Sequence, residues 1–388
     1  MADMIRLISI YFVLWALLLS SCAAPLSSPT PTSELTPTLT LEPTPTPILE
    51  PTPTLEPIPF MLSTPGPYFA GVQKYSLVDE SRNNREIQLT IWYPALKQTD
   101  PDGHIIEHNA IADMSGAPYP MILTSPNTAQ YLFLDHLVSY GFVMAIVGYP
   151  DSSDYWDFEM IDHPRDMIFA LNQIASNSVV ELEGVIDTDH VGVTGYSSDG
   201  DVALGVSGAR IDPEFYLSHC EQATSMQPAP PAEWIQSICG LTQKWNEFSS
   251  HAGDEVTASD DGLWQPVTDE RIRAVMIMSS GGAWLYGDQG LATVDLPLFI
   301  IAATNDGIVP YQFEAEYIFE HIGTPDRVLI SFIGKGHMMV FNTEQSNRMK
   351  HFAIAFFGYY LQERDEYAIY FSEDFVERYD DLVWGVYK

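Results

Sequence analysis

Residues 191–200 read Val-Gly-Val-Thr-Gly-Tyr-Ser-Ser-Asp-Gly, and this run carries the clearest structural signal in the 388-residue chain. Its apolar start predicts a buried strand, its Gly-Tyr-Ser turn predicts a sharp bend, and the small residues that follow predict a helix. Such a turn projects one serine hydroxyl above a sheet. Ser197 has Gly195 two positions before it. Asp199 stands two positions after it, so the G-x-S-x-G pattern fails by one residue.

The rest of the chain alternates strand-like and helix-like segments. Short apolar runs bounded by turn residues are typical of parallel strands that are buried on both faces. Helical patterns lie between them at residues 164–174, 311–322 and 343–362. The alternation predicts an α/β fold, a mostly parallel, doubly wound sheet with helices on both faces. The expected strands are residues 88–93, 120–124, 143–147, 191–194, 274–278, 298–302 and 328–332.

Two regions depart from this alternation. Residues 208–270 are rich in Pro, Ser, Asp and Gly, which predicts a lid-like insertion over the carboxyl edge of the sheet. The aromatic C-terminus, from Tyr367 to Trp384, is expected to form a helix that packs back on the domain. The folded domain is expected to span residues 67–388.

Ser197 is the expected nucleophile, with Ser198 as the alternative. A reactive serine needs a base and an orienting carboxylate. Asp306 follows one predicted strand in an Asn-Asp-Gly turn, and His337 follows the next strand behind Gly-Lys-Gly. Because parallel strands end at the same edge of a sheet, we expect the three side chains to form a catalytic triad there. An ordinary turn aspartate and an exposed loop histidine are the alternatives.

Two backbone N–H groups are expected to stabilise an oxyanion beside the serine. One belongs to Ser198, the residue after the nucleophile. The other should come from the loop after strand 120–124. Pro126 has no N–H there, so Asn127 and Thr128 are available, and we favour Thr128.

The remaining polar clusters predict no further chemistry. Asp166, Asp199 and Asp201 are rival acids for the triad, but they stand at helix starts or beside the serine, where a carboxylate caps a helix. The acidic loop at residues 151–159 lacks the spacing of a calcium loop. No nucleotide-binding or zinc-binding motif is present in the sequence, so neither a metal nor a cofactor is expected.

The N-terminal residues predict an export signal and a tether. Residues 1–21 contain Arg6 and an apolar run typical of a secretory signal peptide, too short to span a bilayer comfortably. The run ends in Leu-Ser-Ser-Cys, which resembles a lipobox and predicts lipidation of Cys22. An ordinary signal peptide and an uncleaved anchor are the alternatives. Residues 22–66 are Pro- and Thr-rich without hydrophobic periodicity, which predicts a disordered tether. The domain would then be lipid-anchored at the cell envelope, outside the cytoplasm.

Cysteine content and charge agree with this location. Cys220 and Cys239 lie 19 residues apart and are expected to form one disulfide in an exported domain, with two free thiols as the alternative. The 17 Lys and Arg residues against 52 Asp and Glu give a net charge of −35, which repels phosphate backbones and excludes nucleic acid as a partner. Contact with a membrane is expected through the lipid anchor alone. The oligomeric state is left open.

The chain resembles bacterial dienelactone-hydrolase-like enzymes of the platelet-activating-factor acetylhydrolase group, in the α/β-hydrolase superfamily, over about residues 66–386. This resemblance implies Ser197, Asp306 and His337 as the triad, and the N–H groups of Ser198 and Thr128 as the oxyanion hole. The chain departs from the family at Pro126-Asn127, where His-Gly is usual, and at Asp199, where Gly is usual. The resemblance rests on residues 85–95 (REIQLTIWYPA), 136–141 (HLVSYG), 163–166 (HPRD), 191–200, 209–212 (ARID), 304–310 and 336–337 (GH), and on the cysteine pair.

The expected function is a serine hydrolase that cleaves carboxylic esters through an acyl-enzyme. Its substrate would be a short-chain acyl lipid, a soluble ester or a polyester. A peptidase or thioesterase could use the same triad, because a fold does not fix a substrate. A non-catalytic binding protein that keeps the fold is the other alternative, with Asp199 and Pro126 as marks of a lost oxyanion hole.

Overall fold

The computed structural model describes residues 59–126, 134–149, 158–176 and 178–388. Every described residue belongs to one compact unit, residues 54–388. Cys22, the expected signal peptide and most of the expected tether lie outside the described residues. Across the described ranges, helices that are long and apolar enough to cross a membrane are absent.

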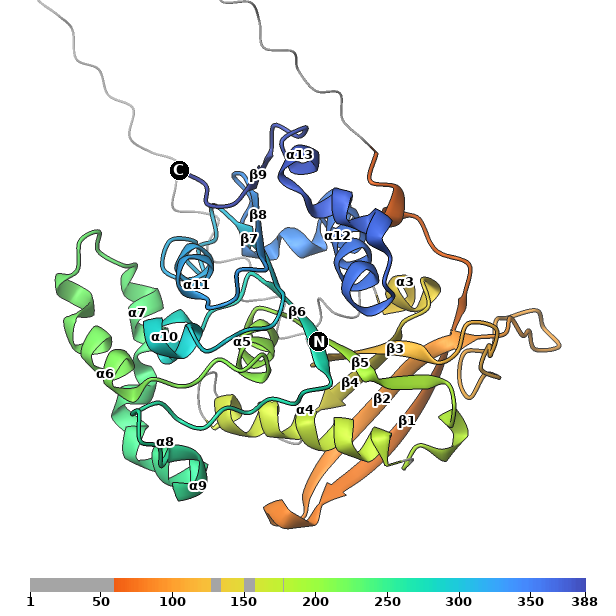
Figure 1. The fold of residues 1–388 in the computed structure, drawn as a ribbon, viewed down its shortest axis with the longest axis horizontal. Helices are drawn as coiled ribbons and strands as arrows, with labels where there is room; N and C mark the ends of the chain where they lie inside the picture. The colour runs from red at the N-terminus through yellow and green to blue at the C-terminus, as the bar shows by residue number, and fades with distance from the viewer. Residues whose placement is uncertain (1–58, 127–133, 150–157, 177) are drawn as a thin grey trace, which may run out of the picture. The chain divides into compact units, whose positions relative to one another are not determined.

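The described residues form an α/β fold around one nine-stranded, mostly parallel sheet (Figure 1). The sheet order is β1-β2-β4-β3-β5-β6-β7-β8-β9. Strands β3 to β8 pair in parallel, whereas β1–β2, β2–β4 and β8–β9 are antiparallel. The strands are β1 Phe69–Asp79, β2 Arg85–Ala95, β3 Tyr119–Thr124, β4 Val143–Gly148, β5 Ile186–Tyr196, β6 Ile272–Met278, β7 Leu298–Ala303, β8 Arg327–Phe332 and β9 Leu382–Trp384.

Helices cover both faces of this sheet, which confirms the predicted doubly wound α/β architecture (Figure 1). The α-helices are α3 Leu134–Ser139, α4 Glu159–Ala175, α5 Ser198–Val206, α6 Pro213–Gln222, α7 Ala232–Ile238, α8 Trp245–Ala252, α9 Asp254–Thr257, α10 Ala283–Leu291, α11 Ala315–His321, α12 Thr343–Leu361 and α13 Glu373–Val376. Short 3-10 helices are η1 Met61–Ser63, η2 Glu80–Arg82, η3 Val180–Leu182, η4 Ala223–Ser225, η5 Gly240–Lys244, η6 His337–Phe341 and η7 Asp365–Phe371.

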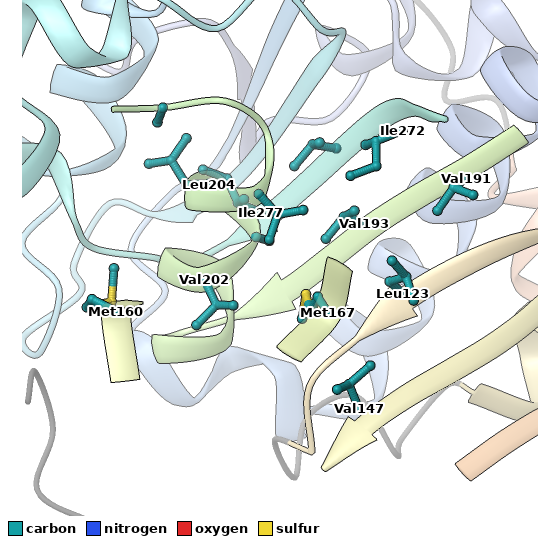
Figure 2. Packing of buried hydrophobic residues seen from close by; sticks show 14 of the residues in the cluster. Leu123, Val147, Met160, Met167, Val191, Val193, Val202, Leu204, Ile272 and Ile277 are labelled. Atoms are coloured by element: carbon teal, nitrogen blue, oxygen red, sulfur yellow. The ribbon is translucent and has the colours of Figure 1, made fainter. Parts of the chain in front are cut away.

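The core is divided by the sheet into two hydrophobic clusters. Successive residues of a buried strand point to opposite faces, so Ile300 belongs to one cluster and Ile301 to the other. Helices α4, α5, α10 and α11 supply the first cluster, part of which is drawn in Figure 2. Helices α3, α12 and α13 supply the second. Burial on both faces explains why the central strands read as continuous apolar runs.

Two strands were not expected from the sequence, and the expected C-terminal helix is wrong. Strand β1 lies at an edge and alternates buried and exposed residues, so it lacks a continuous apolar run. Strand β9 has three residues. The aromatic C-terminus folds into η7, α13 and β9 instead of one helix, and its rings, such as Phe371 and Phe375, pack against α12.

Two helix boundaries also differ from the prediction. Helix α4 begins at Glu159, so Pro164 lies inside it rather than at its start. A proline inside a helix removes the bond to the carbonyl four residues earlier. Met160, Pro164 and Met167 are nevertheless all buried in this helix. Helix α11 begins at Ala315, because residues 311–314 form a turn that carries Glu314 inward.

The predicted insertion at residues 208–270 is largely helical. Helices α6 to α9 lie within it, together with the 3-10 helices η4 and η5. The structure joins Cys220 at the end of α6 to Cys239 at the end of α7 by a disulfide. Trp234 of α7 stacks on Phe313, in the segment that follows β7. The insertion therefore contacts the segment that follows β7.

The folded contacts begin before the expected boundary at residue 66. Leu62 donates its backbone N–H to Nδ1 of His351 at 3.0 Å, and its carbonyl oxygen lies 2.8 Å from Nε2 of His136. Phe60 stacks on Tyr379. Burial lowers the pKa of both histidines, to about 3 for His351, so both rings are neutral at pH 7. The last residues of the expected tether thus belong to the folded domain.

A buried ion pair fastens the β1–β2 hairpin to α4. The carboxylate of Asp166 is fully buried and lies 2.8 Å from Nη2 of Arg85 and 2.5 Å from Nη2 of Arg82. Removing one partner of a buried pair leaves the other charge uncompensated. We therefore expect Asp166→Ala to lower the free energy of unfolding by about 3 kcal/mol, measured by denaturant titration.

Asp381→Ala is the matched control, because Asp381 pairs with Arg348 but is 38% exposed. Exposed pairs contribute less than about 1 kcal/mol. If Asp166→Ala and Asp381→Ala lowered the free energy of unfolding equally, the buried carboxylate would have no special role in stability.

Candidate active site

Ser197 stands at a strained turn between β5 and α5. Its backbone adopts φ 57° and ψ −129°, a conformation that non-glycine residues rarely take. The Ser197 N–H donates to the carbonyl of Met278 at the end of β6, at 2.9 Å. The Ser197 carbonyl accepts from the N–H of Gly200 at 2.8 Å. The first contact fixes the turn to the neighbouring strand, and the second closes it onto α5.

Two glycines allow β5 and α5 to approach this closely. A Cβ on Gly195 would lie 2.1 Å from the carbonyl oxygen of Asp199. A Cβ on Gly200 would lie 2.4 Å from Cβ of Ser280, in the turn after β6. The close approach thus falls at Gly200, three positions after the serine. This explains why the chain tolerates Asp199 where the simple motif would have glycine.

The structure brings Ser197, His337 and Asp306 together as expected. Oγ of Ser197 lies 3.0 Å from Nε2 of His337, and Nδ1 of His337 lies 2.8 Å from Oδ2 of Asp306. Asp306 also accepts the backbone N–H groups of Ile308 and Val309 at 2.9 and 2.8 Å. A carboxylate only accepts hydrogen bonds. Nδ1 therefore carries the imidazole proton, which leaves Nε2 free to accept the serine proton.

Backbone contacts hold the two loops of the triad side by side. Asn305, beside the triad aspartate, donates its N–H to the carbonyl of Lys335 at 2.9 Å. Gly334 donates its N–H to Oγ1 of Thr304 at 2.8 Å. Both triad side chains beyond the serine are buried, with His337 8% and Asp306 9% exposed. The loops thus fix His337 and Asp306 at the ends of β8 and β7.

Half of the expected oxyanion hole lies within the described residues. Ser198 is the first residue of α5, and the first N–H groups of a helix have no partner within it. Thr128 and Asn127 lie outside the described residues. The preceding Ser125 is buried and its Oγ lies 2.6 Å from the hydroxyl of Tyr149.

The three rival acids lie apart from the triad contacts. Asp166 belongs to the ion pair with Arg82 and Arg85. Asp201 is a buried residue of α5 and accepts the N–H of Gly281 at 2.5 Å. Asp199 is 8% exposed in the first turn of α5. Burial raises the pKa of Tyr149 well above its usual range, and the negative charge of Asp199 adds to this shift, which places that charge near the Ser125 loop.

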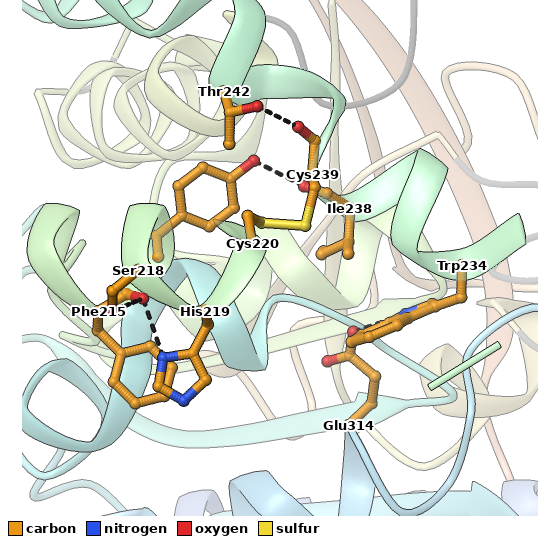
Figure 3. The surroundings of a disulfide bond; sticks show 10 residues. Phe215, Ser218, His219, Cys220, Trp234, Ile238, Cys239, Thr242 and Glu314 are labelled. Atoms are coloured by element: carbon orange, nitrogen blue, oxygen red, sulfur yellow. Dashed lines mark hydrogen bonds between the residues drawn. A yellow bond between two sulfur atoms is a disulfide. The ribbon is translucent and has the colours of Figure 1, made fainter. Parts of the chain in front are cut away.

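A buried contact that the sequence did not reveal links the insertion to the site region. Trp234 of α7 donates its indole N–H to Oε1 of Glu314 at 3.1 Å (Figure 3). Glu314 is fully buried, and burial raises its pKa well above its usual range. The sequence pattern placed Glu314 inside the expected helix at residues 311–322 and gave no signal of this role.

One cluster of residues away from the triad could hold a metal ion. In the part of the chain that the structure describes, Asp100, Asp102 and His104 are the one group close enough together to share an ion. They lie in the exposed connection between β2 and β3, not at the strand ends that carry the triad. Exposed acidic turns of this kind are common without an ion.

Comparison with known proteins does not assign this chain to a family. The chain matches no protein-family model and no curated protein.

The glycine contacts predict which substitution damages the turn. Gly200→Ala would push a methyl group into Ser280, and overpacking of this kind costs about 1–3 kcal/mol. We expect a lower melting temperature together with displacement of Ser197 from His337, seen as slower labelling by a serine-directed fluorophosphonate. Gly240→Ala is the control, because a Cβ there meets no atom within 4 Å. Normal labelling of Gly200→Ala would show that the close approach is unimportant.

Proposed function

We propose that this protein is a serine hydrolase with the α/β-hydrolase fold, and that it cleaves carboxylic esters through an acyl-enzyme. The observation that carries the proposal is the hydrogen-bonded series from Ser197 through His337 to Asp306, with contacts of 3.0 and 2.8 Å. The three residues follow β5, β7 and β8, in the chain order of α/β-hydrolase triads. The strained turn at Ser197 supports the same proposal, since such strain is concentrated at functional sites.

In the proposed reaction, Oγ of Ser197 attacks the ester carbonyl carbon while its proton passes to Nε2 of His337. The carbonyl oxygen becomes negative and accepts the N–H of Ser198. His337 returns the proton to the departing alcohol. A water molecule then attacks the acyl-enzyme, with His337 again accepting the proton, and releases the acid and free Ser197. Asp306 stays ionised and stabilises the imidazolium in both halves of the reaction.

The proposed substrates are neutral or cationic esters. The net charge of −35 disfavours a strongly anionic substrate or surface. A short-chain acyl lipid, a soluble ester and a polyester all remain within this class. We also propose that the domain works at the cell envelope, tethered through Cys22. The Cys220–Cys239 disulfide supports a location outside the reducing cytoplasm.

Replacing the proposed nucleophile tests the function directly. Ser197→Ala should abolish fluorophosphonate labelling and lower ester turnover by ~10³-fold or more, because triad members act as a unit. Ser225→Ala, which changes an exposed serine of the insertion, is the control and should behave as the parent.

Labelling that persists in Ser197→Ala would show that another residue is the nucleophile, and Ser198 would be the first candidate. A parent protein that is neither labelled nor active on esters, thioesters or peptides would instead favour the non-catalytic alternative.

Asp199 should oppose the negative charge that develops on the substrate. At roughly 6 Å and an effective dielectric constant near 20, two like charges repel by about 2–3 kcal/mol. The N-terminus of α5 offsets part of this repulsion. Asp199→Asn keeps the side-chain size and removes the charge, so we expect kcat on a neutral activated ester to rise ~10-fold, since each 1.36 kcal/mol is tenfold.

Glu344→Gln, which removes an exposed charge at the start of α12, is the matched control. A slower and less stable Asp199→Asn variant would show that this carboxylate supports the turn instead.

A further inference from the structure

Glu314 is a buried carboxyl group that touches two different helices. Its Oε1 accepts the indole N–H of Trp234 in α7 at 3.1 Å, and its Oε2 accepts the backbone N–H of Ala283 at the start of α10 at 2.9 Å. Trp234 is itself 6% exposed and packs against Phe313 and Trp284. One side chain therefore bridges the inserted helix α7 and the first turn of α10. Figure 3 shows its contact with Trp234.

The turn before α10 is held from its other side by a second buried carboxylate. Gly281 donates its N–H to Oδ1 of Asp201 in α5 at 2.5 Å. A Cβ on Gly281 would lie 3.3 Å from Oε1 of Glu314 and 3.5 Å from both carboxylate oxygens of Asp201. The hydroxyl of Tyr286 in α10 donates to the backbone carbonyl of Asp201 at 3.2 Å. Residues 279–282 are thus enclosed between Glu314 and the helix that begins at the nucleophile.

The same turn supports the nucleophile directly. It follows Met278, whose carbonyl accepts the N–H of Ser197 at 2.9 Å. Ser280 is the residue against which Gly200 packs. A displacement of residues 279–282 would therefore reach the strained backbone of Ser197 without any intermediate element.

We propose that Glu314 is a positioning residue of the active site, through which Trp234 of the inserted helix α7 fixes the turn that supports Ser197. This inference rests on the proposed hydrolase function and deepens it. The insertion then helps to set the distance between Ser197 and His337. Loss of the indole N–H would leave a buried oxygen without its donor, and the Glu314 side chain would then reorient.

Two substitutions and their combination test this connection. Trp234→Phe removes the donor and keeps an aromatic ring. Glu314→Gln keeps the size, but it can accept only one of the two N–H groups and turns its own NH₂ toward the other. We expect each single variant to lower kcat on a small neutral ester about 10-fold with little change in KM. The double variant should be no slower than Glu314→Gln alone, because residues that act through one contact are not additive.

Trp264→Phe is the matched control. Trp264 is a buried tryptophan of the same insertion, and it packs against Trp245 and Phe248. Its loss should lower the melting temperature as much as Trp234→Phe does, while kcat is unchanged. Equal effects of the two tryptophan substitutions on kcat, or strictly additive effects in the double variant, would overturn the proposal.

Hydrogen exchange separates this inference from the proposed function. Trp234→Phe and Glu314→Gln should accelerate amide exchange in residues 195–206, and Trp264→Phe should not. This result is independent of turnover, so it decides the connection even if the parent protein proves inactive on esters. Unchanged exchange in residues 195–206 of Trp234→Phe would refute the connection, whatever the activity.

Discussion

The site depends on the close packing of β5, α5 and the turn after β6. Gly195 and Gly200 remove the two side chains that would keep these segments apart, and the Ser197–Met278 hydrogen bond fixes the strained backbone between them. A strained residue persists only where its surroundings determine it fully. The hydrophobic clusters on both faces of the sheet provide that rigidity, because close-packed interiors resist small displacements.

Several buried side chains around Ser197 are acidic. Asp199, Asp201, Asp306 and Glu314 all lie in the segments that surround Ser197, and all are at most 9% exposed. Backbone N–H groups donate to Asp306, Asp201 and Glu314. These fixed dipoles hold the three acidic side chains in place.

Sequence patterns predicted the buried centre of the fold better than its edges. All seven expected strands are present. Six of them are short apolar runs because they are buried on both faces, whereas β2 alternates before Pro94. Strand β1 was not predicted because Gln73, Lys74 and Ser76 interrupt its apolar residues, and β9 is too short to carry a pattern. Ser197, Asp306 and His337 were found because each follows a strand with turn residues. Trp234 and Glu314 were not, because their contact joins residues 80 positions apart and leaves no local spacing.

The attachment of residues 60–62 would determine where a pull along the preceding chain enters the domain. Phe60 and Leu62 contact α12, α13 and α3 through His351, Phe375 and His136. Leu62 and Phe375 belong to the cluster on one face of the sheet, and Phe60 packs against it. The inserted helices pack into the cluster on the opposite face. A pull transmitted along the chain into Phe60 would be borne first by the long helix α12. The sheet would then shield the insertion, and with it the support of Ser197, from that force.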